Sequence, residues 1–99
     1  MDEESECNSP VRLLVLDVLK PHKPNIVDFG KKLCREHKVD NAIISVYAVD
    51  EKTESLKMTI EGENIDFDRI KDLIEENGGA VHSIDKVMVG NKPPGPEKA

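Results

Sequence analysis

Aromatic residues are scarce in this chain of 99 residues, which has no tryptophan, one tyrosine and two phenylalanines. Its core must therefore be packed from aliphatic side chains, and the stacked aromatic rings of an RNA-recognition sheet are not expected. Basic residues are also few: the chain has 14 lysines and arginines and 20 acidic residues, which gives a formal net charge of -6. This balance argues against a nucleic-acid backbone or an anionic membrane as the main partner.

Cysteines and long apolar runs are limited as well. The two cysteines, Cys7 and Cys34, are too few and too differently placed for a disulfide framework, so a reducing cytoplasm is the expected compartment. The acidic start has no apolar signal segment, and no run reaches the length of a transmembrane helix. The spacings CxxC and HxxxH do not occur, and no Ser/His/Asp arrangement can be argued, which weighs against catalysis.

Hydrophobic patterning divides the chain into three parts. A polar leader at 1–10 and a proline-rich tail at 91–99 are expected to be disordered, and one domain is expected over 11–90. Apolar runs predict four strands, at 11–19, 42–49, 55–61 and 80–89. Two helices are expected to begin at the N-cap residues Asn25 and Asp66.

The elements follow the order strand, helix, strand, strand, helix, strand, which at this length predicts an α+β, ferredoxin-like fold. Right-handed crossovers then give an antiparallel sheet in the spatial order fourth, first, third, second, with both helices on one face. Alternation in the third strand points its apolar residues to the core. Its polar residues Lys57, Thr59 and Glu61 are expected on the other, half-solvated face.

The first strand, VRLLVLDVL, is apolar on both faces. Two helices cover one face, and a chain this short has little left to cover the second, so a partner subunit is expected there. Asp17 needs a cation, a hydrogen-bond donor or water. Two interpretations stay open for it: a salt bridge on the sheet or at an interface, and a metal or ligand contact. Pro21 and Pro24 are expected to end the strand ladder, because proline has no N–H to donate.

A metal site is the most specific hypothesis, because three neighbouring strands of the predicted sheet carry potential ligands. These are Asp17, Glu61, His82 and Asp85. Carboxylate oxygens favour calcium or magnesium, whereas a histidine ligand shifts the preference toward zinc. The alternative is that these are ordinary surface residues.

Positive charge gathers at a second place, the corner that holds Lys20, His22 and Lys23 after the first strand. Cations before a helix N-terminus suit a carboxylate or phosphate, so a small anionic ligand is one hypothesis for this corner. A rigid turn with solvated lysines is the other.

Three segments carry a family resemblance: LVLDVLKPHKP at 14–24, ISVYAVDEKTESLKMTIEGENIDFDRI at 44–70 and GGAVHSIDKVMVG at 78–90. They resemble the archaeal domain of unknown function 211 family. The resemblance implies an archaeal cytosolic protein with a ferredoxin-like fold that forms a homo-oligomer, with a closed ring among the forms to be considered. By motif match it marks as functional candidates Asp17, Lys20, His22, Glu54, Lys57, Glu61, His82 and Asp85.

These patterns together predict a small cytoplasmic homo-oligomer that is not an enzyme and that binds a ligand or cation as a regulatory module. Calcium or magnesium is the cofactor to consider, and neither nucleic acid nor a membrane is expected as a partner. The alternative is a divalent-metal-dependent enzyme that uses Asp17, Glu61 and His82.

Overall fold

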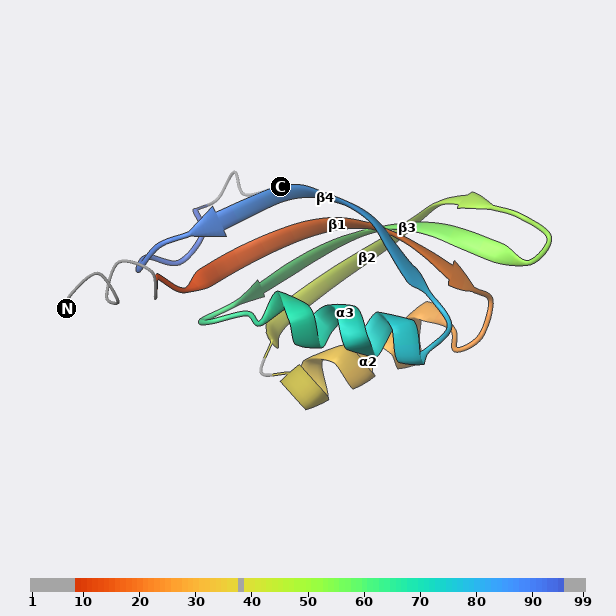
Figure 1. Cartoon of the computed structure of the whole chain (residues 1–99), viewed down its shortest axis with the longest axis horizontal. Helices are drawn as coiled ribbons and strands as arrows, with labels where there is room; N and C mark the ends of the chain where they lie inside the picture. The colour runs from red at the N-terminus through yellow and green to blue at the C-terminus, as the bar shows by residue number, and fades with distance from the viewer. Residues whose placement is uncertain (1–8, 38, 96–99) are drawn as a thin grey trace.

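The computed structural model describes residues 9–37 and 39–95. Its elements are β1 (Val11–Pro21), α2 (Ile26–His37), β2 (Val39–Val49), β3 (Thr53–Gly62), α3 (Phe67–Glu76) and β4 (Ala80–Val89). The strands form one antiparallel sheet in the order β2-β3-β1-β4, with both helices on one face (Figure 1). The predicted ferredoxin-like fold and strand order are confirmed. Most of the predicted leader and part of the predicted tail, residues 1–8 and 96–99, lie outside the described residues.

Both helices begin with the predicted side-chain caps. The side-chain oxygen of Asn25 accepts the backbone N–H of Asp28 at 2.9 Å. Asp66 accepts the N–H groups of the second and third residues of α3 at 3.1 and 3.4 Å. These bonds satisfy first-turn donors that have no partner within a helix. Neither helix of the described chain is long and apolar enough to cross a membrane.

The hydrophobic core lies between the helices and one face of the central strands β1 and β3. Its most buried side chains are Leu14, Leu16, Val18, Phe29, Leu33, Leu56, Met58, Ile60, Ile70, Leu73 and Ile74. Burying one such side chain contributes about 1.5–3 kcal/mol. Because side chains alternate along a strand, Asp17 points to the opposite, helix-free face of β1.

Gly30 shows how closely α2 approaches the sheet. A Cβ atom at this position would lie 3.3 Å from Cδ1 of Ile44 in β2. A glycine on the apolar stripe of a helix costs about 1 kcal/mol relative to alanine, so a packing reason is expected for it. Close approach to the sheet is that reason.

The end of β1 differs from the prediction. The strand continues through Lys20 and Pro21, which pair with Glu54 and Thr53 of β3, whereas the sequence predicts that the prolines end the ladder. Pairing with β4 stops at Leu19. Pro21 therefore has a neighbouring strand on one side only, and its missing N–H is tolerated as it is at a sheet edge.

The helix-free face is more covered than predicted at one end. Thr59 and Glu61 expose only 9% and 8% of their surface, and Leu13, which lies opposite Glu61, exposes 1%. The prediction of a half-solvated row is wrong at these two positions. The reason is that β3 is a central strand, so that its side chains on this face have neighbours on both sides.

The sheet is longer than the layer of helices that covers it. In Figure 1 the β2–β3 hairpin extends past the helices at one end, and the start of β1 with the end of β4 extends past them at the other. The edge strands contribute little to the core, since Val39 is the one buried residue that the structure shows in β2 and β4 together.

Candidate functional site

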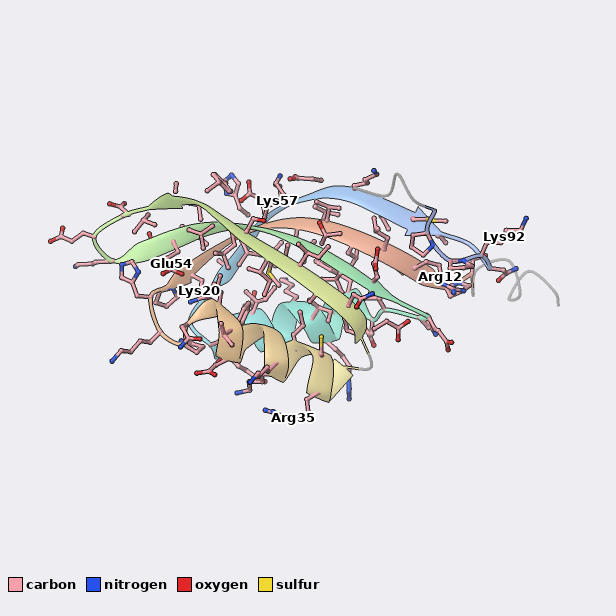
Figure 2. All side chains as sticks on the ribbon, turned by 180° about the vertical axis from the view of Figure 1, so that it is seen from behind. Arg12, Lys20, Arg35, Glu54, Lys57 and Lys92 are labelled. Atoms are coloured by element: carbon pink, nitrogen blue, oxygen red, sulfur yellow. The ribbon has the colours of Figure 1, made fainter. Side chains whose placement is uncertain are left out.

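The functional candidates gather in two places on the sheet. The corner cluster, at the junction of β1 and α2, is Lys20, His22 and Glu54. The face cluster, on the helix-free face, is Asp17, Tyr47, Lys57, Ser83 and Asp85. In Figure 2, Lys20 and Glu54 lie beside each other at the corner, and Lys57 lies on the side of the sheet away from the helices.

Lys20 is completely buried in the corner cluster. Its Nζ donates to the backbone oxygen of Pro21 at 2.6 Å and to that of Pro24, and lies 3.5 Å from Oε1 of Glu54. Nζ also lies 5.8 Å from the centre of the Phe29 ring, a favourable cation–π distance. An ammonium group has three N–H donors, of which two are used by the backbone oxygens of Pro21 and Pro24, while the Glu54 carboxylate supplies a nearby negative charge.

His22 joins the corner to the tip of the β2–β3 hairpin. Its Nδ1 lies 3.1 Å from Oε2 of Glu54, and its Nε2 lies 3.0 and 3.1 Å from the backbone oxygens of Asp50 and Glu51. The hydrogen bond with the Glu54 carboxylate, followed by those with the two carbonyl groups, raises the pKa of His22. The same bond is the main cause that lowers the pKa of Glu54, and Lys20 adds to it.

The corner offers little to a bound anion. The ammonium group of Lys20 is buried with two of its donors used and a carboxylate beside it, and both ring nitrogens of His22 face protein oxygens. Of the three residues predicted to bind an anion, Lys23 is the most exposed. The carboxylate of Glu54 beside the other two would repel a negative ligand.

The face cluster connects all four strands. The hydroxyl group of Tyr47 in β2 donates to the carboxylate of Asp17 in β1, with oxygen distances of 2.7 and 2.9 Å. Lys57 in β3 forms an ion pair with Asp85 in β4, and Asp85 also accepts the hydroxyl group of Ser83 at 2.7 Å. Asp17 thus has the hydrogen-bond donor that a carboxylate in an apolar strand requires.

Two members of this cluster stand at β-bulges. Tyr47 is the additional residue of a bulge in β2, and Asp85 is the additional residue of one in β4. A bulge bends the strand and changes the face to which a side chain points. Alternation with Ile43 and Ser45, which pair with Thr59 and Lys57, already places Tyr47 on this face. Sequence reasoning missed it, and its one signal was that it is the chain's single tyrosine.

The electrostatics of the face cluster hold its groups in their usual charge states. Asp17 raises the pKa of the Tyr47 hydroxyl group, and Asp85 raises that of Lys57. Lys57, followed by Ser83, lowers the pKa of Asp85. A general base or nucleophile needs a pKa moved toward neutrality instead. The arrangement is that of a structural or recognition network.

The four predicted metal ligands are spread over the sheet. Glu61 lies opposite Leu13, four positions before Asp17 on β1, which corresponds to about 13 Å along the strand. His82 is exposed in β4, and Asp85 is engaged by Lys57. Within residues 9–37 and 39–95, no three His, Cys, Asp or Glu side chains lie close enough together to hold a metal ion.

Comparison with known proteins identifies the family. The model of the DUF211 family, described as uncharacterized ArCR, matches residues 12–93. The chain belongs to this family. An uncharacterized protein of the archaeon Methanocaldococcus jannaschii is 50% identical over 82 residues, which are 83% of this chain and 84% of that protein. The resemblance of the three segments is confirmed.

The DUF211 chain also has an apolar groove between α2 and the edge strand β2. The groove has a volume of about 400 Å³, and its lining includes Ile26, Gly30 and Cys34 from α2 with Ala42 and Ile44 from β2. Ala42 and Ile44 pair with core residues of β3, so the groove lies on the helix side of the sheet. It opens where β2 has no neighbouring strand.

Proposed function

We propose that this DUF211 protein assembles with copies of itself by pairing the β4 edge of one copy with the β2 edge of the next, and that it acts in the cytoplasm as a non-enzymatic assembly module. The observation that carries the proposal is the distribution of exposed apolar side chains. They gather on the two strands whose outer edges have no neighbour.

Seven of the nine large apolar side chains exposed in the described chain belong to edge strands. They are Ile43, Val46, Tyr47 and Val49 in β2 and Ile84, Val87 and Val89 in β4. The central strands expose one such residue, Leu19. Apolar side chains on an open sheet edge mark an interaction surface or an aggregation risk, and proteins commonly guard free edges with charges or prolines. Self-pairing would bury both edges.

The directions of the strands suit this joint. Every neighbouring pair in the order β2-β3-β1-β4 is antiparallel, so β2 and β4 run in opposite directions. The β4 edge of one copy would therefore continue the antiparallel pattern beside β2 of the next copy. Because the two edges are different surfaces, the joint is heterologous, and its repetition gives a closed ring or a filament.

The helix side of the sheet supports the same joint. Ile84 and Val87 pair with Leu16 and Leu14, whose side chains face the helices. Ile84 and Val87 nevertheless each expose 51% of their surface. A β4 strand placed beside β2 of a neighbour would bring these two residues to the groove under that neighbour's α2. Each Å² of apolar surface covered there contributes about 25 cal/mol.

Two charge substitutions test the joint. Ile43→Lys changes the β2 edge and Ile84→Lys changes the β4 edge, and both residues expose 51% of their surface. By native mass spectrometry we expect a defined oligomer for the unmodified protein and a monomer for each variant alone. An equimolar mixture of the variants should give heterodimers, because one intact β4 edge and one intact β2 edge remain to form a single joint.

Leu19→Lys serves as the matched control, since Leu19 exposes 43% of its surface on a central strand, and it should leave the oligomer unchanged. A monomeric unmodified protein at micromolar concentration would refute the proposal. A dimer that survives Ile84→Lys would show a symmetric β2–β2 contact and would overturn the heterologous joint.

A further inference from the structure

Both ring nitrogens of His22 face groups that can only accept hydrogen bonds. Nδ1 lies 3.1 Å from the Glu54 carboxylate, and Nε2 lies 3.0 and 3.1 Å from the backbone oxygens of Asp50 and Glu51. A neutral imidazole has one N–H and one lone pair. Either neutral tautomer would therefore place a lone pair against an oxygen, and only the imidazolium form donates on both sides.

The surrounding charges favour the imidazolium form. Glu54 in β3 provides the nearest negative charge, and it is shared with the buried Lys20 of β1, which lies 3.5 Å from its other oxygen. The side chain of His22 is 40% exposed, so a proton can exchange with solvent. The remaining charged side chains of the corner and the hairpin tip are exposed: Lys23, Asp50, Glu51 and Lys52.

We propose that His22 is a proton-dependent latch, which fastens the tip of the β2–β3 hairpin to the corner between β1 and α2 while it is an imidazolium. The tip lies beyond the helices (Figure 1), and its turn is closed by the hydrogen bond from Asp50 N–H to the backbone oxygen of Thr53 at 2.8 Å. Loss of the proton leaves one ring nitrogen facing an oxygen without a hydrogen. The tip then opens. The opening stays confined to the tip, because Lys20 still holds Glu54.

The direction of each shift sets the pH range of the latch. The pKa of His22 in the folded protein is raised above its ordinary value of 6.5. Its contribution to stability is therefore complete below pH 6.5 and is lost as the pH rises through this raised pKa. The pKa of Glu54 is lowered below 4.5, so its contribution is complete above pH 4.5 and is lost as the pH falls through the lower pKa. The latch is therefore complete between these two values and opens as the pH rises through the raised pKa of His22.

Nuclear magnetic resonance of the full chain labelled with ¹⁵N-histidine reports the charge of the ring directly. We expect a titration midpoint above 6.5 for His22, with both nitrogens protonated below it. In Glu54→Gln the midpoint should fall, because the nearest carboxylate is gone. A midpoint at or below 6.5 in the unmodified protein would overturn the proposal.

Amide hydrogen exchange measures the opening of the tip. After correction for intrinsic exchange, protection of residues 50–53 should fall about three- to tenfold between pH 6 and pH 9, while amides of Leu16 and Met58 keep theirs. In His22→Gln the tip protection should be low at both pH values. Tip protection that is independent of pH in the unmodified protein, or that stays high in His22→Gln, would overturn the latch. All these contacts lie within one chain, so the latch does not require self-assembly.

Discussion

Replacing Lys20 by methionine keeps most of the buried side-chain volume and removes the ammonium group. The backbone oxygens of Pro21 and Pro24 lose their donor, and the Glu54 carboxylate loses its buried cation. A buried acceptor without a partner costs about 1–3 kcal/mol. These three groups are only partly buried, so the lower end of that range applies to each. Lys20→Met should therefore lower the free energy of unfolding by about 3 kcal/mol.

Urea unfolding at one fixed protein concentration measures this loss. With a typical urea dependence of about 1–3 kcal/mol per molar, the midpoint should fall by about 1–3 M. Lys23→Met is the matched control, because it makes the same substitution at an exposed lysine of the same corner. Its effect should stay within about 0.5 kcal/mol.

A Lys20→Met protein as stable as the unmodified chain would refute this reasoning. The double variant Lys20→Met with Glu54→Gln separates the partners of the ammonium group. If Glu54 is the main partner of the Lys20 ammonium group, the double variant should lose less stability than the two single variants together. If the carbonyl oxygens of Pro21 and Pro24 are the main partners, the two losses should be additive.

Three further substitutions test the packing and the helix caps by the same urea assay. Gly79→Ala would place a Cβ atom 2.9 Å from the backbone oxygen of Leu19, which cannot move freely, so a loss of about 1–3 kcal/mol is expected. Gly30→Ala would place a Cβ atom 3.3 Å from the flexible end of Ile44. Alanine gains about 1 kcal/mol of helix propensity, which offsets the tight contact, so the loss should be smaller than for Gly79→Ala, and equal losses for the two glycines would contradict this. Asp66→Ala removes the cap of α3 and should cost about 1 kcal/mol, and an unchanged midpoint would show that the cap is not needed.

The strand order and the helix starts could be predicted because local signals agreed with one another. The alternation in β3 and the caps Asn25 and Asp66 each depend on residues close together in the sequence. The strand 80–89 was predicted with the bounds that the structure shows. The family resemblance also marked every member of the corner cluster.

The contacts of those residues could not be predicted, because they depend on positions far apart in the chain. Lys20 is buried because Pro24 and Glu54 lie beside its ammonium group. Without knowledge of these contacts, a lysine at the end of a strand is predicted to be exposed to solvent. Tyr47 and Asp85 each stand at a bulge, where two residues of one strand lie opposite one residue of its neighbour, and the sequence alone does not locate such a bulge. The metal hypothesis depended on the predicted order of three neighbouring strands, and that order is confirmed, but its four residues lie at separate positions along those strands.

Strand β2 carries the exposed edge and leads directly into Asp50, which contacts His22. Val39 is its one buried residue, so in a single chain β2 is held by its ladder with β3, by α2 and by the latch at the tip. A partner strand would add a second ladder to the same element. Protonation of His22 and binding of a partner strand both favour an ordered β2. Each should therefore strengthen the other, and by the same factor. The Ile43→Lys chain separates the two effects, because it lacks the joint and keeps every contact of the latch.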